Sequence, residues 1–165
     1  MKTLAAWRSL LERLLEGITI ILMVGLAAVV VVAIVYRTAG SALSWYDEVA
    51  SVQLAWLTYY AAALAAMKRA HISVPGFVTG LKPRFRVPLA VASRVIVMGF
   101  FLLLAWQGYD VLMVLAGDTL ISLPEISTQF TQSVIPIGAI LFVLAELFNL
   151  PIVLREARGL EDTPA

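Results

Sequence analysis

Four long apolar segments separated by short polar ones make up most of the chain. They cover about residues 17–36, 49–67, 87–109 and 126–147. The hydrocarbon core of a bilayer is about 30 Å thick and needs roughly 20 apolar residues in a helix, a length that the four segments match. The pattern predicts an all-α integral membrane protein with four spanning helices in a single membrane domain over residues 1–165, without an internal repeat.

The composition indicates that these helices are solvated by lipid rather than water. Of the 165 residues, 61% are hydrophobic and 14% are charged, whereas soluble domains rarely exceed about half apolar residues. The chain has no cysteine and one histidine, which excludes disulfides, thiolate metal sites and a bis-histidine haem within it. It also lacks the basic runs interleaved with aromatic residues that are typical of nucleic-acid binding. We therefore expect no cofactor in this chain and no nucleic-acid partner.

Lysine and arginine residues predict the orientation, because loops that carry them stay in the cytoplasm. Three lie before the first span, five between the second and third spans, and two after the fourth. The other two loops hold Arg37 alone. Both termini and the central loop are therefore expected in the cytoplasm.

The two ends of the chain differ from the spans. Residues 1–16 have leucines at helical spacing with charged residues between them, which predicts an amphipathic helix on the inner membrane surface rather than a cleavable signal. Trp7 would lie at the level of the headgroups. Residues 148–165 are predicted to form a cytoplasmic tail.

Two adjacent acids, Asp47 and Glu48, stand at the start of the second predicted span. Two aromatic residues, Trp45 and Tyr46, precede them. Ser44 and Asp47 have the spacing of a capping box, and the first turn of a helix favours acids. Capping and topology thus explain the pair. Docking of a partner protein at the outer face is the alternative, and it would explain why two acids occur together beside two aromatic side chains.

Three polar residues, Lys68, Arg69 and His71, follow the second span. The C-terminal end of a helix favours cations, and the cytoplasmic side retains them. These residues are therefore interpreted as a cytoplasmic motif that ends the helix. A lone histidine at such a place is more often a cap or an interfacial side chain than a ligand or catalyst.

Three residues inside the predicted spans are unusual for helices in lipid: Arg94, Glu146 and Pro136. A charge within a bilayer is costly and usually paired, and counting about 1.5 Å per residue puts Arg94 and Glu146 in the same leaflet. We expect either a direct or water-bridged pair, or two side chains that reach the interface separately. Pro136, in the middle of the fourth span, is expected to kink that helix or loosen one of its hydrogen bonds.

The spans show neither a polar pathway nor a catalytic cluster. A transporter that works alone usually has paired repeats and broken helices around a polar midplane site. A membrane enzyme needs a nucleophile, an acid–base pair or metal ligands close together. The sequence favours a helical subunit that is not an enzyme and works by binding other proteins.

Four short motifs occur in order along the chain. A W-x-(D/E)-E motif opens the second span, a base before His-Ile follows it, Leu-Pro precedes the fourth span, and Ile-Pro-x-Gly lies within it. The matching residues are Trp45, Asp47, Glu48, Arg69, His71, Ile72, Leu123, Pro124, Ile135, Pro136, Ile137 and Gly138. In these motifs, and in having four spans with both ends inside, nearly the whole chain resembles the small permease (Q) subunit of tripartite ATP-independent periplasmic (TRAP) transporters, the DctQ-like family.

The resemblance implies a place in the bacterial inner membrane and two protein partners. A large permease (M) subunit would bind the sodium ions and move the solute, and this chain would brace it among the membrane lipids. A periplasmic solute-binding protein (P) would deliver a carboxylate-bearing solute for sodium-coupled uptake, with residues 45–48 helping it to dock. The alternative is a non-catalytic assembly subunit of another inner-membrane complex.

Overall fold

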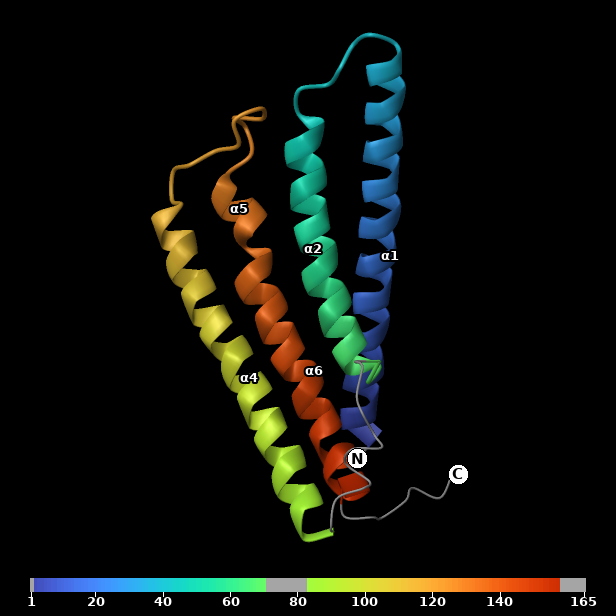
Figure 1. Cartoon of the computed structure of the whole chain (residues 1–165), viewed down its shortest axis with the longest axis vertical. Helices are drawn as coiled ribbons and strands as arrows, with labels where there is room; N and C mark the ends of the chain where they lie inside the picture. Colours follow the sequence, from blue (N-terminus) through green and yellow to red (C-terminus); the bar gives the residue numbers. More distant parts are fainter. Residues whose placement is uncertain (1, 71–82, 158–165) are drawn as a thin grey trace.

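The computed structural model describes residues 2–70 and 83–157 of the chain (Figure 1). Every regular element in these ranges is an α-helix. The helices are α1 (Lys2–Thr38), α2 (Tyr46–Met67), α4 (Pro83–Val114), α5 (Thr128–Gln132) and α6 (Val134–Ala157). Within the described ranges, four helical segments are long and apolar enough to cross a bilayer, which confirms the predicted all-α fold with four spans.

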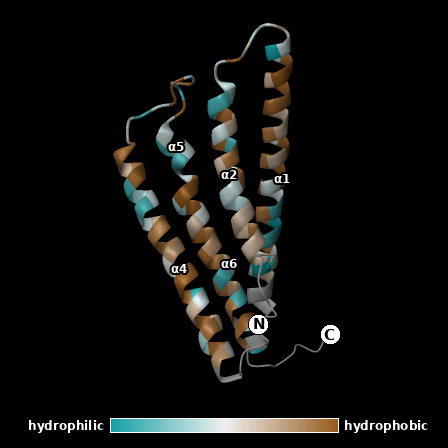
Figure 2. Ribbon diagram, viewed as in Figure 1, coloured by the Kyte–Doolittle hydropathy of each residue, from teal (hydrophilic) through white to brown (hydrophobic). Residues whose placement is uncertain are grey.

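The long helices stand side by side in the order α1, α2, α6, α4 (Figure 1). The main contacts run from α1 to α2, from α2 to α6 and from α6 to α4. The arrangement is therefore an open row, with α1 and α4 at its edges, and not a closed bundle. The ribbons of both edge helices are coloured hydrophobic along much of their length (Figure 2), and these helices carry exposed apolar side chains such as Ile21 and Ile96, each 71% exposed. Such surfaces suit lipid or another membrane protein.

The two ends of the row differ in what they carry. The start of α1 and the end of α6 lie together at one end, here termed the termini end (Figure 1). The connections over residues 39–45 and 115–127 lie at the other, here termed the loop end. This is the arrangement that four antiparallel spans require. That the termini end faces the cytoplasm stays a prediction from the basic residues.

The first helix is longer than the predicted first span. It runs without a break from Lys2 to Thr38, so residues 2–16 belong to the same helix as the first span and are not a separate helix. The reason lies in the packing of Leu11 and Leu15. Leu15 is 1% exposed in the core beside Met67, and Leu11 packs against the same cluster. That residues 2–16 lie on the inner membrane surface stays a prediction.

The predicted fourth span is divided into two helices, with the break at Ser133. Pro136 lies in the first turn of α6, where a missing N–H is harmless. The proline ring would clash with a helical carbonyl at Gln132, so the helix is interrupted before Pro136 instead of being kinked in mid-span. Helix α6 then continues to Ala157, so the first part of the predicted tail is helical and packed against α2.

Glycines set the distance between neighbouring helices. A Cβ atom at Gly138 of α6 would lie 2.7 Å from Cβ of Tyr59 on α2. A Cβ atom at Gly108 of α4 would lie 3.0 Å from Cγ2 of Ile135 and 3.1 Å from Cδ of Pro136. Close approach of this kind is the main source of helix association in lipid. The Ile-Pro-x-Gly motif is thus the point at which α6 meets both of its neighbours.

Candidate functional site

The two in-span charges lie together near the termini end. Arg94 of α4 donates through Nη1 to Oε2 of Glu146 on α6, forming an ion pair. The carboxylate side chain is 3% exposed and the arginine side chain 30% exposed. A carboxylate so deeply buried is tolerable only with a cation and hydrogen bonds beside it. The pair joins α4 to α6.

Asn149 lies one helical turn after Glu146 and is 1% exposed. Its Nδ2 donates to the carbonyl of Ala66 at 2.7 Å and to that of Met67 at 3.4 Å. The last carbonyls of a helix have no partner within it, so Asn149 satisfies the end of α2 from α6. The sequence interpretation placed Asn149 in the tail. A lone amide side chain in the apolar run after Glu146 was the signal that could have identified it.

Helix α1 reaches the same end of α2. Nη2 of Arg8 donates to the Met67 carbonyl at 3.3 Å, and Nζ of Lys68 lies 3.2 Å from Oε1 of Glu16. Arg69 adopts a left-handed conformation with φ of 56°. The N–H groups of Arg69 and Ala70 then bond back to Ala66 and Ala65, which is a Schellman ending. Of the predicted cytoplasmic motif, Lys68 and Arg69 end the helix, and His71 lies outside the described residues.

These contacts form a continuous polar connection across the row, here termed the termini-end belt. Its side chains are Arg8, Glu16, Lys68, Arg94, Glu146 and Asn149. The belt joins α1 to α2, α2 to α6 and α6 to α4, so each long helix is tied to its neighbour by a polar contact.

Glu48 makes the main polar contact at the loop end. Its Oε1 accepts from the N–H of Ile121 at 3.1 Å, and its Oε2 accepts from the N–H of Ser122 at 2.8 Å and from the Ser122 hydroxyl. The predicted docking residues are therefore divided between two roles. Glu48 is bonded within the chain, whereas Asp47 is exposed and Trp45 and Tyr46 are half-buried.

The predicted capping box at Ser44 does not form. The N-cap of α2 is Trp45, which makes no side-chain capping bond. The helix begins one residue later than a box between Ser44 and Asp47 requires, and Glu48 occupies the third helical position instead. Its carboxylate bonds the distant loop and leaves the helix N-terminus without a side-chain cap.

Two further side chains hold α5 between its neighbours. Nε1 of Trp56 on α2 donates to the carbonyl of Thr131 at 2.8 Å, and Nε2 of Gln129 donates to the carbonyl of Leu112 on α4 at 2.9 Å. The Trp56 ring also lies 5.3 Å from that of Phe130, centre to centre. Trp56 thus both packs against α5 and hydrogen-bonds to it.

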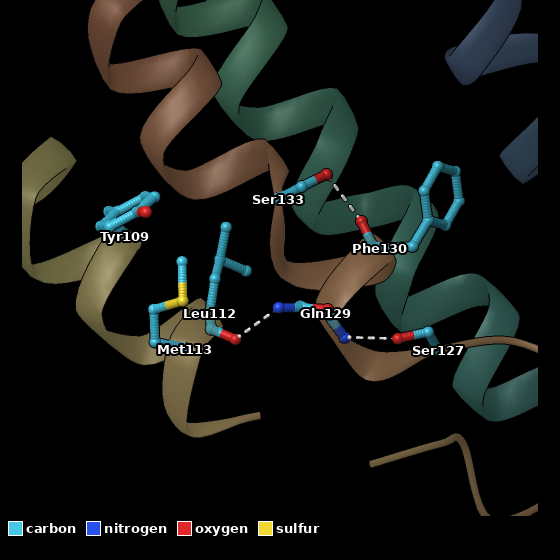
Figure 3. A pocket seen from close by; sticks show the side chains of 7 residues that line it. All are labelled: Tyr109, Leu112, Met113, Ser127, Gln129, Phe130 and Ser133. Carbon is cyan, nitrogen blue, oxygen red and sulfur yellow. Dashed lines mark hydrogen bonds between the residues drawn. The ribbon is translucent and has the colours of Figure 1, made fainter. Parts of the chain in front are cut away.

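An open groove of about 470 Å³ lies between α4 and α5 (Figure 3). Three of its polar side chains have partners: Gln129 bonds Leu112, Ser127 accepts from the Gln129 N–H, and Ser133 donates to Phe130. The rest of the lining is apolar except for the hydroxyl of Tyr109. Within residues 2–70 and 83–157 no three acidic, histidine or cysteine side chains are placed to hold a metal ion. The absence of a cofactor stays a prediction.

Comparison with curated proteins gave no match. A family model described as "Tripartite ATP-independent periplasmic transporters, DctQ component" matches residues 26–155. The matched part contains α2, α4 and α5 whole, most of α6 and about the last third of α1, together with Glu48, the Arg94–Glu146 pair and Asn149. Since the match covers most of the chain, this protein belongs to the DctQ family, the small membrane subunits of TRAP transporters.

Proposed function

We propose that this subunit braces the large permease subunit of its transporter and helps a periplasmic solute-binding protein to dock. The complex then takes up a carboxylate-bearing solute with sodium ions that are bound by the large subunit. The observation that carries the proposal is the row itself. Its helices are tied together at both ends by polar bonds. The four predicted apolar segments, 17–36, 49–67, 87–109 and 126–147, contain Arg94 and Glu146 as their charged residues, and these two are paired with each other.

The contacts along the row support a static role. The termini-end belt ties α1, α2, α6 and α4 together, Glu48 ties α2 to the 115–127 connection, and Trp56 ties α2 to α5. Between these ends the helices approach closely at Gly108 and Gly138. A slab held in this way suits a scaffold against which another subunit moves.

The charges support an orientation with the termini end in the cytoplasm of a bacterium and the loop end in the periplasm. Arg8, Arg13, Lys68 and Arg69 lie at the termini end, and the described loop end has acidic side chains with Arg37 as its basic residue. This asymmetry is what the positive-inside rule requires of a multi-pass inner-membrane protein. The periplasmic partner would then meet an acidic surface.

The experiment is reconstitution of the chain with and without its large subunit in liposomes that hold a sodium gradient. We expect solute uptake only with both membrane subunits and the binding protein present. Sodium-dependent uptake by this chain alone would overturn the bracing function. Full uptake by the large subunit without this chain would favour an assembly role elsewhere. Purification of the native complex distinguishes that alternative, since other inner-membrane proteins would then accompany the chain.

A further inference from the structure

The connection between α4 and α5 is folded at the loop end. Thr119 and Ser127 form an antiparallel bridge, with bonds from Leu120 N–H to Ile126 O at 3.0 Å and from Thr128 N–H to Asp118 O at 2.9 Å. We term residues 118–128 the outer hairpin. Its two arms are joined to each other before any partner is present.

The tip of the outer hairpin is held on α2. Both carboxylate oxygens of Glu48 accept hydrogen bonds from the tip, from the backbone N–H of Ile121 and from the N–H and hydroxyl of Ser122. Bonds to an ionised carboxylate are about twice as strong as neutral ones. Three of them in one place fix the tip against the first turn of α2.

The side chain that this arrangement presents is apolar. Ile121 is 93% exposed, the most exposed of the large hydrophobic side chains in the described residues. Since its own N–H is bonded to Glu48, the residue is held facing outward. Asp118 and Glu125 of the same hairpin are exposed, as is Asp47 next to Glu48 in the chain. An apolar side chain on a fixed support, with exposed acids at the same end of the molecule, has the composition of a protein contact and not of a lipid anchor, because anionic headgroups would repel the acids.

We propose that the outer hairpin is a preformed docking element for the solute-binding protein, in which Ile121 enters an apolar pocket edged by basic residues and Glu48 is the positioning residue that holds it out. The proposal rests on the function proposed above and adds the contact residue and the way it is set. Holding the loop in its bound form before the encounter lowers the entropic cost of association. The acids act mainly on the encounter rate and its dependence on salt.

The test measures uptake against binding-protein concentration in liposomes that contain both membrane subunits. Ile121→Ser is expected to raise the half-saturating concentration roughly tenfold, the loss of one buried aliphatic contact, with the same maximal rate. Val114→Ser is the matched control, because Val114 is 82% exposed at the same end but lies outside the hairpin. It should leave both quantities unchanged.

Glu48→Gln tests the positioning role. It should raise the half-saturating concentration without lowering the maximal rate, and combined with Ile121→Ser it should add little further loss, since both act through one contact. Additive losses would overturn the positioning role. An unchanged half-saturation for Ile121→Ser would overturn the docking role, as would loss of the large subunit on purification of this variant, which would assign Ile121 to that subunit.

A direct readout uses the absence of cysteine from the chain. With Ile121→Cys carrying an environment-sensitive fluorophore, added binding protein should shift the emission to the blue, and empty anionic vesicles should not. A shift with vesicles alone would identify a membrane contact and overturn the proposal. If the wild-type complex shows no uptake but the label still responds to the binding protein, the uptake function fails and the docking element stands.

Discussion

At the scale of single residues, the carboxylate of Glu146 is the charged group that depends most on its partner. It is 3% exposed, and Arg94 is its cation. Removing the arginine leaves a buried charge with little access to water, whereas removing the carboxylate leaves an arginine that is 30% exposed and long enough to reach the interface. The two partners should therefore differ in how well they tolerate the loss of the other.

We expect Arg94→Ala to cost about 1–3 kcal/mol of stability and Glu146→Ala distinctly less. The measurement is the melting temperature of the purified complex, together with its yield. Exchanging the two residues, with Arg94→Glu and Glu146→Arg, should recover part of the loss. Two equal and additive losses without recovery would show that the side chains act separately.

Asn149 is the second residue that should prove sensitive. In Asn149→Leu the Ala66 carbonyl loses its 2.7 Å bond from Asn149 but keeps its 3.0 Å bond from the Arg69 N–H, so we expect the cost of one lost hydrogen bond, about 0.5–1.5 kcal/mol. Asn149→Asp should be worse, because it places a carboxylate against two carbonyl oxygens. Thr58→Val is the control, since Thr58 is exposed and bonds within its own helix to Leu54. Thermal unfolding that ranks the control with Asn149→Leu would contradict the role of the amide.

The sequence predicted that two residues come into contact only where their depth in the membrane was enough to pair them. Arg94 and Glu146 could be placed in one leaflet by counting residues along two helices. The partner of Glu48 lies 74 residues further along the chain, in a connection whose fold has no periodic signal. Asn149 bonds backbone carbonyls, and the sequence does not mark which helix end comes near a given side chain.

At the scale of the helices, glycine positions decide how closely neighbours pack. Gly138→Ala puts a Cβ atom 2.7 Å from Cβ of Tyr59, so α2 and α6 must separate, at a cost of about 1–3 kcal/mol. Gly99→Ala is the matched control, because nothing lies within 4 Å of the position its Cβ would take. It should be neutral or slightly stabilising. If the two variants melt at the same temperature, α2 and α6 are not held in this contact.

The existence of the helices followed from the apolar pattern, because the bilayer fixes the length of a span. Their ends did not. Helix α1 takes in residues 2–16 because Leu15 finds a place in the core. Helix α6 continues past residue 147 because Asn149, in its next turn, hydrogen-bonds to the end of α2 and holds that turn against it. Pro136 was expected to kink the middle of the span or loosen one of its hydrogen bonds, whereas the break falls at Ser133, since a proline is harmless in a first turn and damaging one turn later.

At the scale of the whole molecule, the open row suits the proposed bracing of a larger subunit by so small a chain. A closed bundle would bury its apolar faces within itself, whereas the row leaves the faces of α1 and α4 available. Its own cohesion then depends on few contacts, which the polar belt and the glycine contacts supply. A brace of this kind should keep its shape while the partner moves.

The last prediction is that the row keeps its shape during transport. Since the chain has no cysteine, spin labels can be placed at Ile21→Cys on α1 and Ile96→Cys on α4, both 71% exposed on the edge helices, in a complex whose large subunit is also free of cysteine. The distance between the labels should stay the same, within the width of its distribution, with and without sodium, solute and binding protein. Arg94→Ala in the same background should broaden the distribution by loosening α4 from α6. If the distance between the two labels changes between transport states while Arg94 and Glu146 are intact, the row moves with the solute. The bracing function would then have to be abandoned.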